Sequence, residues 1–130
     1  MVLHFTPNQH VAVGAILIST TKPEQLAGFY AAGLETEAPR PVGADHVGLM
    51  VSETFLGFER VPVQPRNIEA AVTAWFRVVD VRLTYERFLS LGAAIKSPPT
   101  LQPWGETLAE VVDPEGNVIG LMGAALMSQR

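Results

Sequence analysis

The stretch VAVGAILISTTKPEQLAGFYAAG, residues 11–33, joins an apolar run to an amphipathic segment that ends in a glycine. Residues 11–19 are apolar on both faces and rich in β-branched side chains, which predicts a buried strand. Thr21 lies three residues before Glu24, a spacing at which the two side chains can cap a helix reciprocally. Apolar residues then recur at helical spacing, and Gly33 stands where a left-handed residue would end the helix. The stretch therefore predicts a strand followed by a short helix.

A second stretch, VTAWFRVVDVRLTYERFLSLG at residues 72–92, repeats the same order of strand, cap, helix and glycine. Its strand is expected at residues 72–79; Asp80 can cap the helix and Gly92 can end it. Each residue of this stretch lies 59 positions after its counterpart in the first stretch, with no gap. The pairs at this spacing are Ala15 and Ala74, Thr21 and Asp80, Phe29 and Phe88, and Gly33 and Gly92. Together these pairs predict an internal duplication.

Short β patterns follow each helical segment. They predict strands at residues 36–40, 47–52 and 55–61 in the first half, and at 94–96, 107–112 and 118–122 in the second. The turn before the last strand reads Asp113-Pro114-Glu115-Gly116-Asn117, with proline preset for the bend and glycine for a positive φ. Pro62 and Pro65 interrupt regular pairing between the halves. The sequence thus predicts one domain with a module at about 11–61, a linker at about 62–70, a module at about 71–123 and a tail at 124–130.

The composition narrows the classes of function. Hydrophobic residues make up 48% of the 130-residue chain, which is enough to form a core, and the net charge of −4 gives no reason to expect nucleic acid or an acidic membrane as partner. The absence of cysteine excludes disulfides, thiolate nucleophiles and zinc–thiolate sites. The longest apolar run, residues 11–18, is too short to span a bilayer, and the first residues lack the pattern of a signal peptide. We therefore expect a soluble, cytoplasmic protein.

Several short motifs occur in an order that is known from one superfamily. They are Phe29-Tyr30 with Gly33-Leu34, Val79-Asp80, Leu91-Gly92-Ala93, Pro103-Trp104-Gly105 and the turn at residues 113–117. With these motifs the chain resembles, from about residue 11 to 122, the vicinal oxygen chelate superfamily of glyoxalases, bleomycin-resistance proteins and extradiol dioxygenases. The resemblance implies an α+β fold in which two βαβββ modules form a curved mixed sheet around a groove.

The resemblance also locates the positions where metal-dependent members carry histidine, glutamate or glutamine ligands. These positions lie on the first and last strand of each module, and here they are occupied by Ala15, Gly57, Ala74 and Gly120. Methyl groups and hydrogens donate no electron pairs, whereas a divalent cation needs several oxygen or nitrogen ligands. We therefore expect no metal and no cofactor. The alanines and glycines at these four positions therefore argue against lyase, isomerase or dioxygenase chemistry, in which the metal polarises substrate oxygens.

Alternation along the strands predicts the lining of the groove. The predicted ligand-binding residues are Val13, Ala15, Leu17, Phe55, Gly57, Glu59, Val72, Ala74, Phe76, Trp104, Gly120 and Met122. Such a groove is apolar with one carboxylate near its edge, and it suits a flat or amphipathic organic ligand. Trp104 is interpreted first as a packing residue of its turn and second as part of the groove mouth. Trp75 and Arg77 fall on the opposite strand face in this register, and a slip of one residue would bring both into the groove.

Three functions remain open at this point. The first is a metal-free, non-catalytic binder of a hydrophobic or aromatic small molecule, with antibiotic resistance as one role. The second is a metal-dependent enzyme of the superfamily with non-standard ligands, for which His10, His46 and Glu59 form the one cluster that can be assembled. The third is a scaffold that acts through its sheet edges. For each we expect a homodimer, whose modules pair within a chain or are exchanged between chains.

Overall fold

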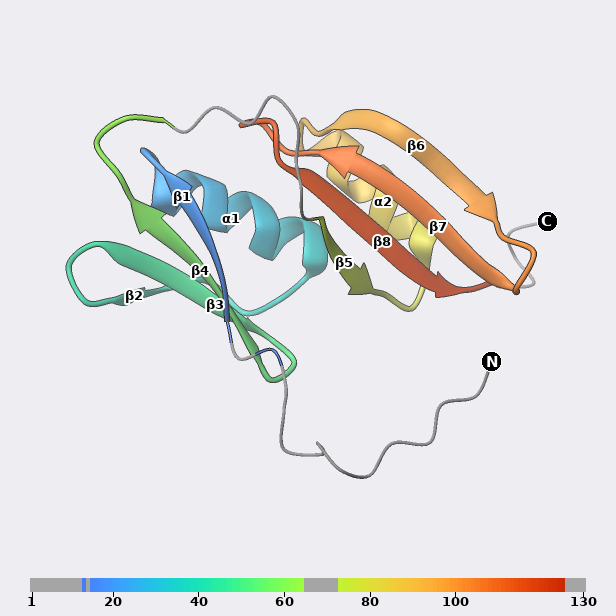
Figure 1. Cartoon of the computed structure of the whole chain (residues 1–130), viewed down its shortest axis with the longest axis horizontal. Helices are drawn as coiled ribbons and strands as arrows, with labels where there is room; N and C mark the ends of the chain where they lie inside the picture. Colours follow the sequence, from blue (N-terminus) through green and yellow to red (C-terminus); the bar gives the residue numbers. More distant parts are fainter. Residues whose placement is uncertain (1–12, 14, 65–72, 126–130) are drawn as a thin grey trace. The chain divides into compact units, whose positions relative to one another are not determined.

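The computed structural model describes residue 13 and residues 15–64 and 73–125 (Figure 1). The elements of this part are β1 (Ala15–Thr20), α1 (Pro23–Leu34), β2 (Arg40–Val42), β3 (His46–Val51), β4 (Thr54–Arg60), β5 (Ala74–Arg77), α2 (Val81–Ser90), β6 (Ala94–Leu101), β7 (Glu106–Val112) and β8 (Val118–Ala124). The order βαβββ therefore occurs twice, which confirms the α+β fold of two modules. The chain forms two compact units. One holds the described residues up to Ala31 with Thr36–Gln64, and the other holds Ala32–Glu35 with the described residues from 73 onward.

The first unit contains a four-stranded mixed sheet in the order β1-β4-β3-β2. Strand β1 runs parallel to β4, and the other neighbours are antiparallel. Leu56 and Phe58 of β4 are 1% and 0% exposed, and the Phe58 ring lies 5.2 Å from the ring of Tyr30 on α1. Successive residues of a strand point to opposite faces of the sheet. Leu56 and Phe58 therefore form the core with α1 on one face, and the residues that alternate with them lie on the other face.

The second unit repeats this arrangement in the order β5-β8-β7-β6, with β5 parallel to β8. Alternate residues of β7 and β8 are buried on the face toward α2, and Phe88 of α2 is fully buried with them. The core residues of β7 and β8 are Ala109, Val111, Ile119 and Leu121. Helix α2 contacts β6, β7 and β8, so one face of this sheet is also covered by a helix (Figure 1).

Helix α2 begins and ends as its sequence predicts. The Asp80 carboxylate accepts a hydrogen bond from the backbone N–H of Leu83 at 3.0 Å, which satisfies a donor that has no partner within the helix. Gly92 follows the last turn with φ of 106°, a value that L side chains rarely adopt. Both predicted helix ends are confirmed.

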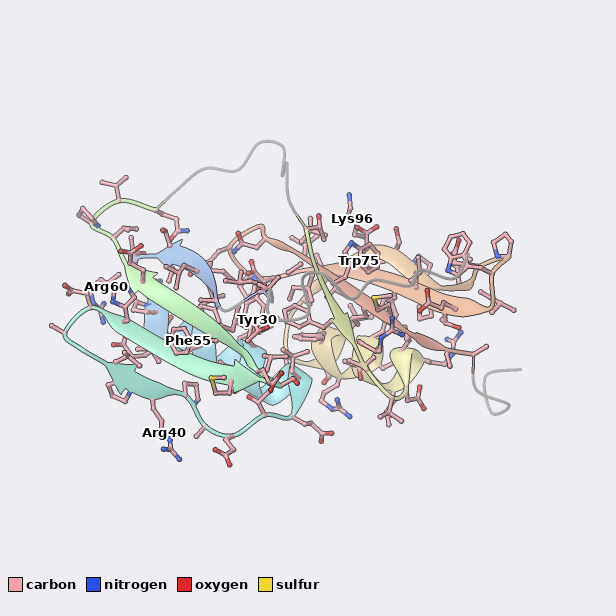
Figure 2. The ribbon with its side chains drawn as sticks, turned by 60° about the horizontal axis from the view of Figure 1, so that its bottom comes forward. Tyr30, Arg40, Phe55, Arg60, Trp75 and Lys96 are labelled. Atoms are coloured by element: carbon pink, nitrogen blue, oxygen red, sulfur yellow. The ribbon has the colours of Figure 1, made fainter. Side chains whose placement is uncertain are left out.

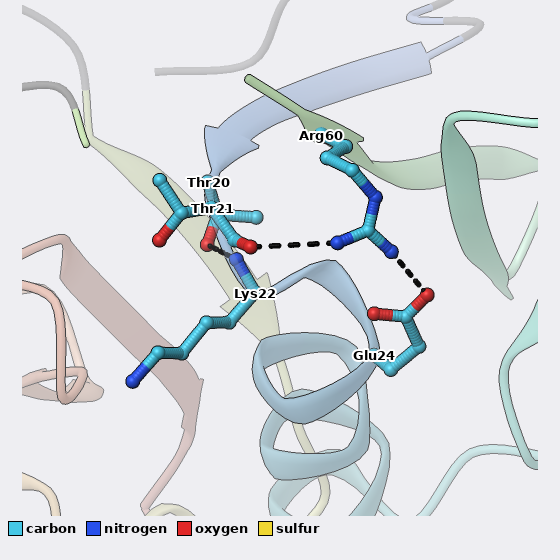
Figure 3. Close-up of polar contacts among 5 residues, drawn as sticks. All are labelled: Thr20, Thr21, Lys22, Glu24 and Arg60. Atoms are coloured by element: carbon cyan, nitrogen blue, oxygen red, sulfur yellow. Dashed lines mark hydrogen bonds and ion pairs between the residues drawn. The ribbon is translucent and has the colours of Figure 1, made fainter. Parts of the chain in front are cut away.

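Helix α1 does not use the predicted capping box. The Thr21 hydroxyl donates to Oε1 of Gln64 at 3.3 Å. The Glu24 carboxylate is bound by Arg60 (Figure 3). Arg60, from the end of β4, also donates to the backbone carbonyl of Thr21 at 3.5 Å. The pKa of Glu24 is lowered, first by a hydrogen bond to its own backbone and then by Arg60. These contacts join the start of α1 to the end of β4 within the first unit.

The predicted role of Gly33 as a left-handed helix end is wrong. Gly33 lies inside α1, and Glu35 is the residue that takes a positive φ, of 57°. Position 33 instead has no room for a side chain, because an added Cβ would lie 2.1 Å from the ring of Phe88, which belongs to the same unit. Gly33 and Gly92 are therefore not equivalent positions, although the assumed spacing pairs them.

Two strand predictions also need correction. Most of the segment predicted at 36–40 is irregular, and the strand there is Arg40–Val42. The strand predicted at 94–96 extends to Leu101 and passes through Pro98 and Pro99. Strand β6 lies at the edge of its sheet, where a residue without an N–H is tolerated. Val72, part of the predicted linker and the tail after residue 125 lie outside the described residues.

The predicted register of β5 is shifted by one residue. Ala74 pairs with Ile119 and Phe76 pairs with Leu121, both of which are fully buried toward α2. The groove positions predicted for Ala74 and Phe76 are therefore wrong. The cause is the assumed spacing, which is one residue too long for the helices, because α1 begins at Pro23 and α2 begins at Val81.

Candidate functional site

Each unit has a sheet face that its helix does not cover. In the first unit this face, which we call the first open face, is defined by cross-strand partners in three pairings. Its residues are Ala15, Leu17 and Ser19 of β1, Phe55, Gly57 and Glu59 of β4, His46, Gly48 and Met50 of β3, and Arg40 and Val42 of β2. The five residues predicted for the groove from β1 and β4 share this face. Val13, before β1, is 62% exposed. Binding of a ligand by any of them stays a prediction.

An aromatic ring covers the glycines at the centre of the first open face. Gly48 and Gly57 are cross-strand partners. The ring of Phe55, which is labelled in Figure 2, lies across both glycines, as the distances to an added Cβ show. A Cβ at Gly48 would be 2.1 Å from Cζ of Phe55, and a Cβ at Gly57 would be 2.6 Å from its Cε2. Any side chain at these positions would displace the ring. Gly57, which the resemblance predicts at a ligand position, therefore provides the space in which an aromatic ring lies.

A pocket of about 390 Å³ lies against this ring. It is lined by Glu37, Ala38, Arg40, Val42, Gly48, Leu49, Met50 and Phe55. Val42 and Met50 are 49% and 55% exposed, so apolar surface is open to a ligand. Glu37 and Arg40 form an ion pair at 3.7 Å, with both side chains largely exposed. The sequence prediction missed Val42 because it ended the strand at residue 40, and it missed Met50 because it named no groove residue from the strand at 47–52.

A second open face lies on the sheet of the second unit. Its residues are Trp75 and Arg77 of β5, Gly120 and Met122 of β8, and Glu106, Leu108 and Glu110 of β7. The Trp75 indole lies against Gly120, because an added Cβ there would be 2.3 Å from Cδ2 and 2.7 Å from Cε2 of the ring. The indole, labelled in Figure 2, replaces Ala74 as the side chain beside Gly120. The exposed fraction of Trp75 is 41%.

Glu106 holds two further groups at the end of the second open face. Its Oε2 accepts from Nη1 of Arg77 at 3.0 Å, and its Oε1 accepts from the indole N–H of Trp104 at 3.0 Å. Arg77 thus has its partner on the open face and not under the helix. Trp104 is 65% exposed, so the interpretation as a packing residue of its turn is wrong.

The two units share one arrangement at equivalent places. Leu17 pairs with Gly57 as Trp75 pairs with Gly120, and the spacing from Leu17 to Trp75 equals the spacing between the two helix starts. In both units an aromatic ring lies over the glycine of the last strand. The rings come from different strands, since Phe55 belongs to β4 and Trp75 to β5.

The residues of the open faces do not fit a divalent metal. With the register corrected, Trp75 stands beside Gly120, and an indole offers an N–H donor but no lone pair. His46 and Glu59 are cross-strand partners, with Nε2 3.8 Å from Oε2. His10, the third member of the cluster considered from the sequence, lies outside the described residues. Within the described residues, no group of three or more His, Asp or Glu side chains could hold a metal ion.

A smaller cavity of about 260 Å³ lies beside the start of α1, where Glu24, Asp45 and Arg60 are among the lining residues. Arg60 is already bound to Glu24, so this cavity presents a neutralised ion pair. Neither of the two described helices has the length and apolarity needed to cross a membrane.

Comparisons with known proteins agree with this geometry. The model of the glyoxalase-like domain family matches residues 15–122. Among curated proteins nothing matches the chain. A glyoxalase/bleomycin resistance protein/dioxygenase family enzyme from Burkholderia phytofirmans PsJN is 16% identical, with 86% of this chain and 98% of that chain covered and a TM-score of 0.76.

Two further solved structures have the same fold. A glyoxalase-related enzyme from Fulvimarina pelagi is 20% identical, with 86% of this chain and 87% of that chain covered and a TM-score of 0.71. A lactoylglutathione lyase from Agrobacterium tumefaciens is 15% identical, with 91% and 96% covered and a TM-score of 0.66. At these identities the likeness establishes the fold. Together with the family match over residues 15–122, it shows that the chain belongs to the glyoxalase-like domain family of the vicinal oxygen chelate superfamily.

Proposed function

We propose that this protein binds a hydrophobic or aromatic small molecule without a metal and without catalysing a reaction. One observation carries the proposal: an aromatic ring lies over the glycine at the ligand position of the last strand in both units. These rings are Phe55 over Gly57 and Trp75 over Gly120. The positions that would hold a metal in other members of the superfamily thus support flat apolar surfaces.

Flat surfaces of this kind bind flat ligands. Aromatic pairs contribute about 0.5–1.5 kcal/mol beyond the area that they bury, and the geometry favours offset stacking. The pocket beside Phe55, about 390 Å³, lies within the size range of small-molecule sites, about 300–1,000 Å³. Its exposed apolar wall at Val42 and Met50 supports the same class of ligand.

The metal-dependent alternative has less support. His46 and Glu59 give it two donors on one face, and the described residues bring no third donor to them. The ligand positions cannot be restored by side-chain rotation, because Gly57 and Gly120 have no side chain. A thermal-shift series with nickel, zinc, iron and manganese tests this alternative. A rise of several degrees with one ion would contradict the metal-free proposal, because an ion that binds the native state tightly raises its midpoint.

The binding proposal is tested by calorimetric titration of the full chain with planar aromatic compounds. We expect micromolar binding by at least one compound, and a loss of about tenfold in affinity, or about 1.4 kcal/mol, on Trp75→Ala or Phe55→Ala. Leu101→Ala is the matched control, since Leu101 is 62% exposed on β6 and belongs to neither open face. A panel without any binder would contradict the proposal.

A role in antibiotic resistance follows if the bound compound is toxic. Support comes from relatives such as the Albidiferax ferrireducens T118 protein, whose name includes bleomycin resistance. Expression in a susceptible bacterium should then raise the inhibitory concentration of the compound, and Trp75→Ala should abolish the effect. The proposal includes a homodimer, for which light scattering of the purified chain should give about twice the 14.0 kDa mass.

A further inference from the structure

We propose that the second open face selects planar aromatic ligands that carry a positive charge. This inference rests on the proposed function, and it adds the charge of the ligand and the residue that recognises it. That residue is Glu110, the cross-strand partner of the glycine that Trp75 covers.

The sheet register places these groups in one row. Gly120 of β8 pairs with Trp75 of β5 on one side and with Glu110 of β7 on the other. Directly opposed residues of neighbouring strands share a sheet face, so all three lie on the second open face. The indole leans from β5 over Gly120, and therefore toward the strand that bears Glu110. A planar ligand stacked on the indole would have its edge next to this carboxylate.

Glu110 has charge available for a ligand. Its Oε1 accepts a hydrogen bond from the Ser97 hydroxyl at 3.2 Å, and within the described residues no Lys, Arg or His lies within ion-pair distance of it. Glu106 on the same face differs, because Arg77 already binds it at 3.0 Å. The second open face thus offers one carboxylate that is not neutralised by a neighbouring side chain.

The indole and the carboxylate favour the same ligand. The face of a tryptophan ring attracts cations more strongly than any other side-chain ring. A protonated amine on the edge of the ligand would also form a charge-assisted hydrogen bond with Glu110. A carboxylate on the ligand would meet Glu110 with like charge. On the first open face, by contrast, Arg40 is paired with Glu37 and Glu59 contacts His46, so we assign the charge preference to the second.

The test compares three ligands that share one ring system: 9-aminoacridine, acridine and acridine-9-carboxylate, which near neutral pH are a cation, a neutral molecule and an anion. Calorimetric titration of the full chain should give about tenfold tighter binding of 9-aminoacridine than of acridine, equivalent to about 1.4 kcal/mol, and the weakest binding for the carboxylate. The preference for 9-aminoacridine over acridine should shrink as the salt concentration rises, because the ion pair between the ligand and Glu110 is partly exposed to solvent.

Variants identify the residues. Glu110→Gln keeps the shape of the side chain and should remove the preference while acridine binds as before. Glu53→Gln is the control for net charge, since Glu53 is exposed in the turn between β3 and β4, and it should leave the preference intact. Trp75→Ala should weaken all three ligands. Circular dichroism of each variant checks that it is folded.

The outcomes separate the two proposals. Equal binding of 9-aminoacridine and acridine, or a preference that survives Glu110→Gln, would overturn the inference and leave the binding function standing. Failure of all three compounds to bind the wild-type chain would count against the stacking function itself.

Discussion

Replacing Gly120 by alanine should turn the Trp75 indole out of its place. The added Cβ would lie 2.3 Å from Cδ2 of the ring, a distance that no real contact allows, so the side chain must move. Full burial of a tryptophan removes about 150–250 Å² of surface, and Trp75 retains 41% exposure. Lifting the ring would re-expose on the order of 80 Å², which is about 2 kcal/mol at about 25 cal/mol per Å². Alanine in a strand recovers about 0.5–1 kcal/mol relative to glycine, so we expect a net loss of about 1–1.5 kcal/mol.

Urea unfolding measures this loss, and the Trp104→Phe background lets fluorescence report on Trp75 alone. We expect emission from Trp75 to shift to longer wavelength in Gly120→Ala, because more of the ring meets water. Gly28→Ala is the matched control: the same methyl group enters α1, where an added Cβ meets nothing within 4 Å. It should stabilise the chain by about 0.5–1 kcal/mol. A Gly120→Ala protein with unchanged stability and unchanged emission would refute the placement of the indole over Gly120.

Three further predictions concern the core, a helix end and pH. Asp80→Ala removes the hydrogen bond to the first turn of α2 and should cost about 1 kcal/mol in urea unfolding, whereas Asp80→Asn should cost little. Phe58→Ala leaves a cavity beside the Tyr30 ring and should cost about 3–5 kcal/mol; a loss below about 1 kcal/mol would contradict full burial. The pKa of Glu24 is lowered by its backbone hydrogen bond and by Arg60, so its contribution to stability is fully present above the ordinary value of 4.5 and is lost as pH falls through the lowered pKa. Glu24→Gln should therefore lessen the fall of the melting temperature on acidification, and identical profiles would show that the pair adds nothing.

The position of α2 was predictable because its start and its end both carry residues with a clear local signal, whereas the signals read for α1 were wrong. Asp80 and Gly92 are residues whose chemistry suits a helix start and a helix end, and both occupy those places. The fold class follows from such local signals together with short β patterns. The predicted strand at 94–96 was too short because the sequence rule that excludes proline from strands does not hold at a sheet edge, where Pro98 and Pro99 lie.

The facing of β5 was not predictable from spacing. A strand repeats every two residues, so an error of one residue in the assumed duplication exchanges its two faces completely. Gly33 and Gly92 suggested the longer spacing, but Gly33 lies inside its helix for reasons of space. The contradictory signal was Arg77, a charged side chain that the assumed register placed under a helix. In the observed register Arg77 is exposed and pairs with Glu106, while the apolar Phe76 is buried on the helix side.

An aromatic ring over a glycine can have either of two roles, and exposure distinguishes them. A ring that only fills space left by a lost ligand would be buried on both faces, as Phe58 and Phe88 are at 0% exposure. Trp75 instead has one side against the backbone of Gly120 and keeps 41% of its surface exposed. Water is a poor partner for that apolar surface, so covering it with a flat ligand gains free energy. For this reason the half-exposed ring supports the proposed binding of a flat ligand more than it supports a purely space-filling role.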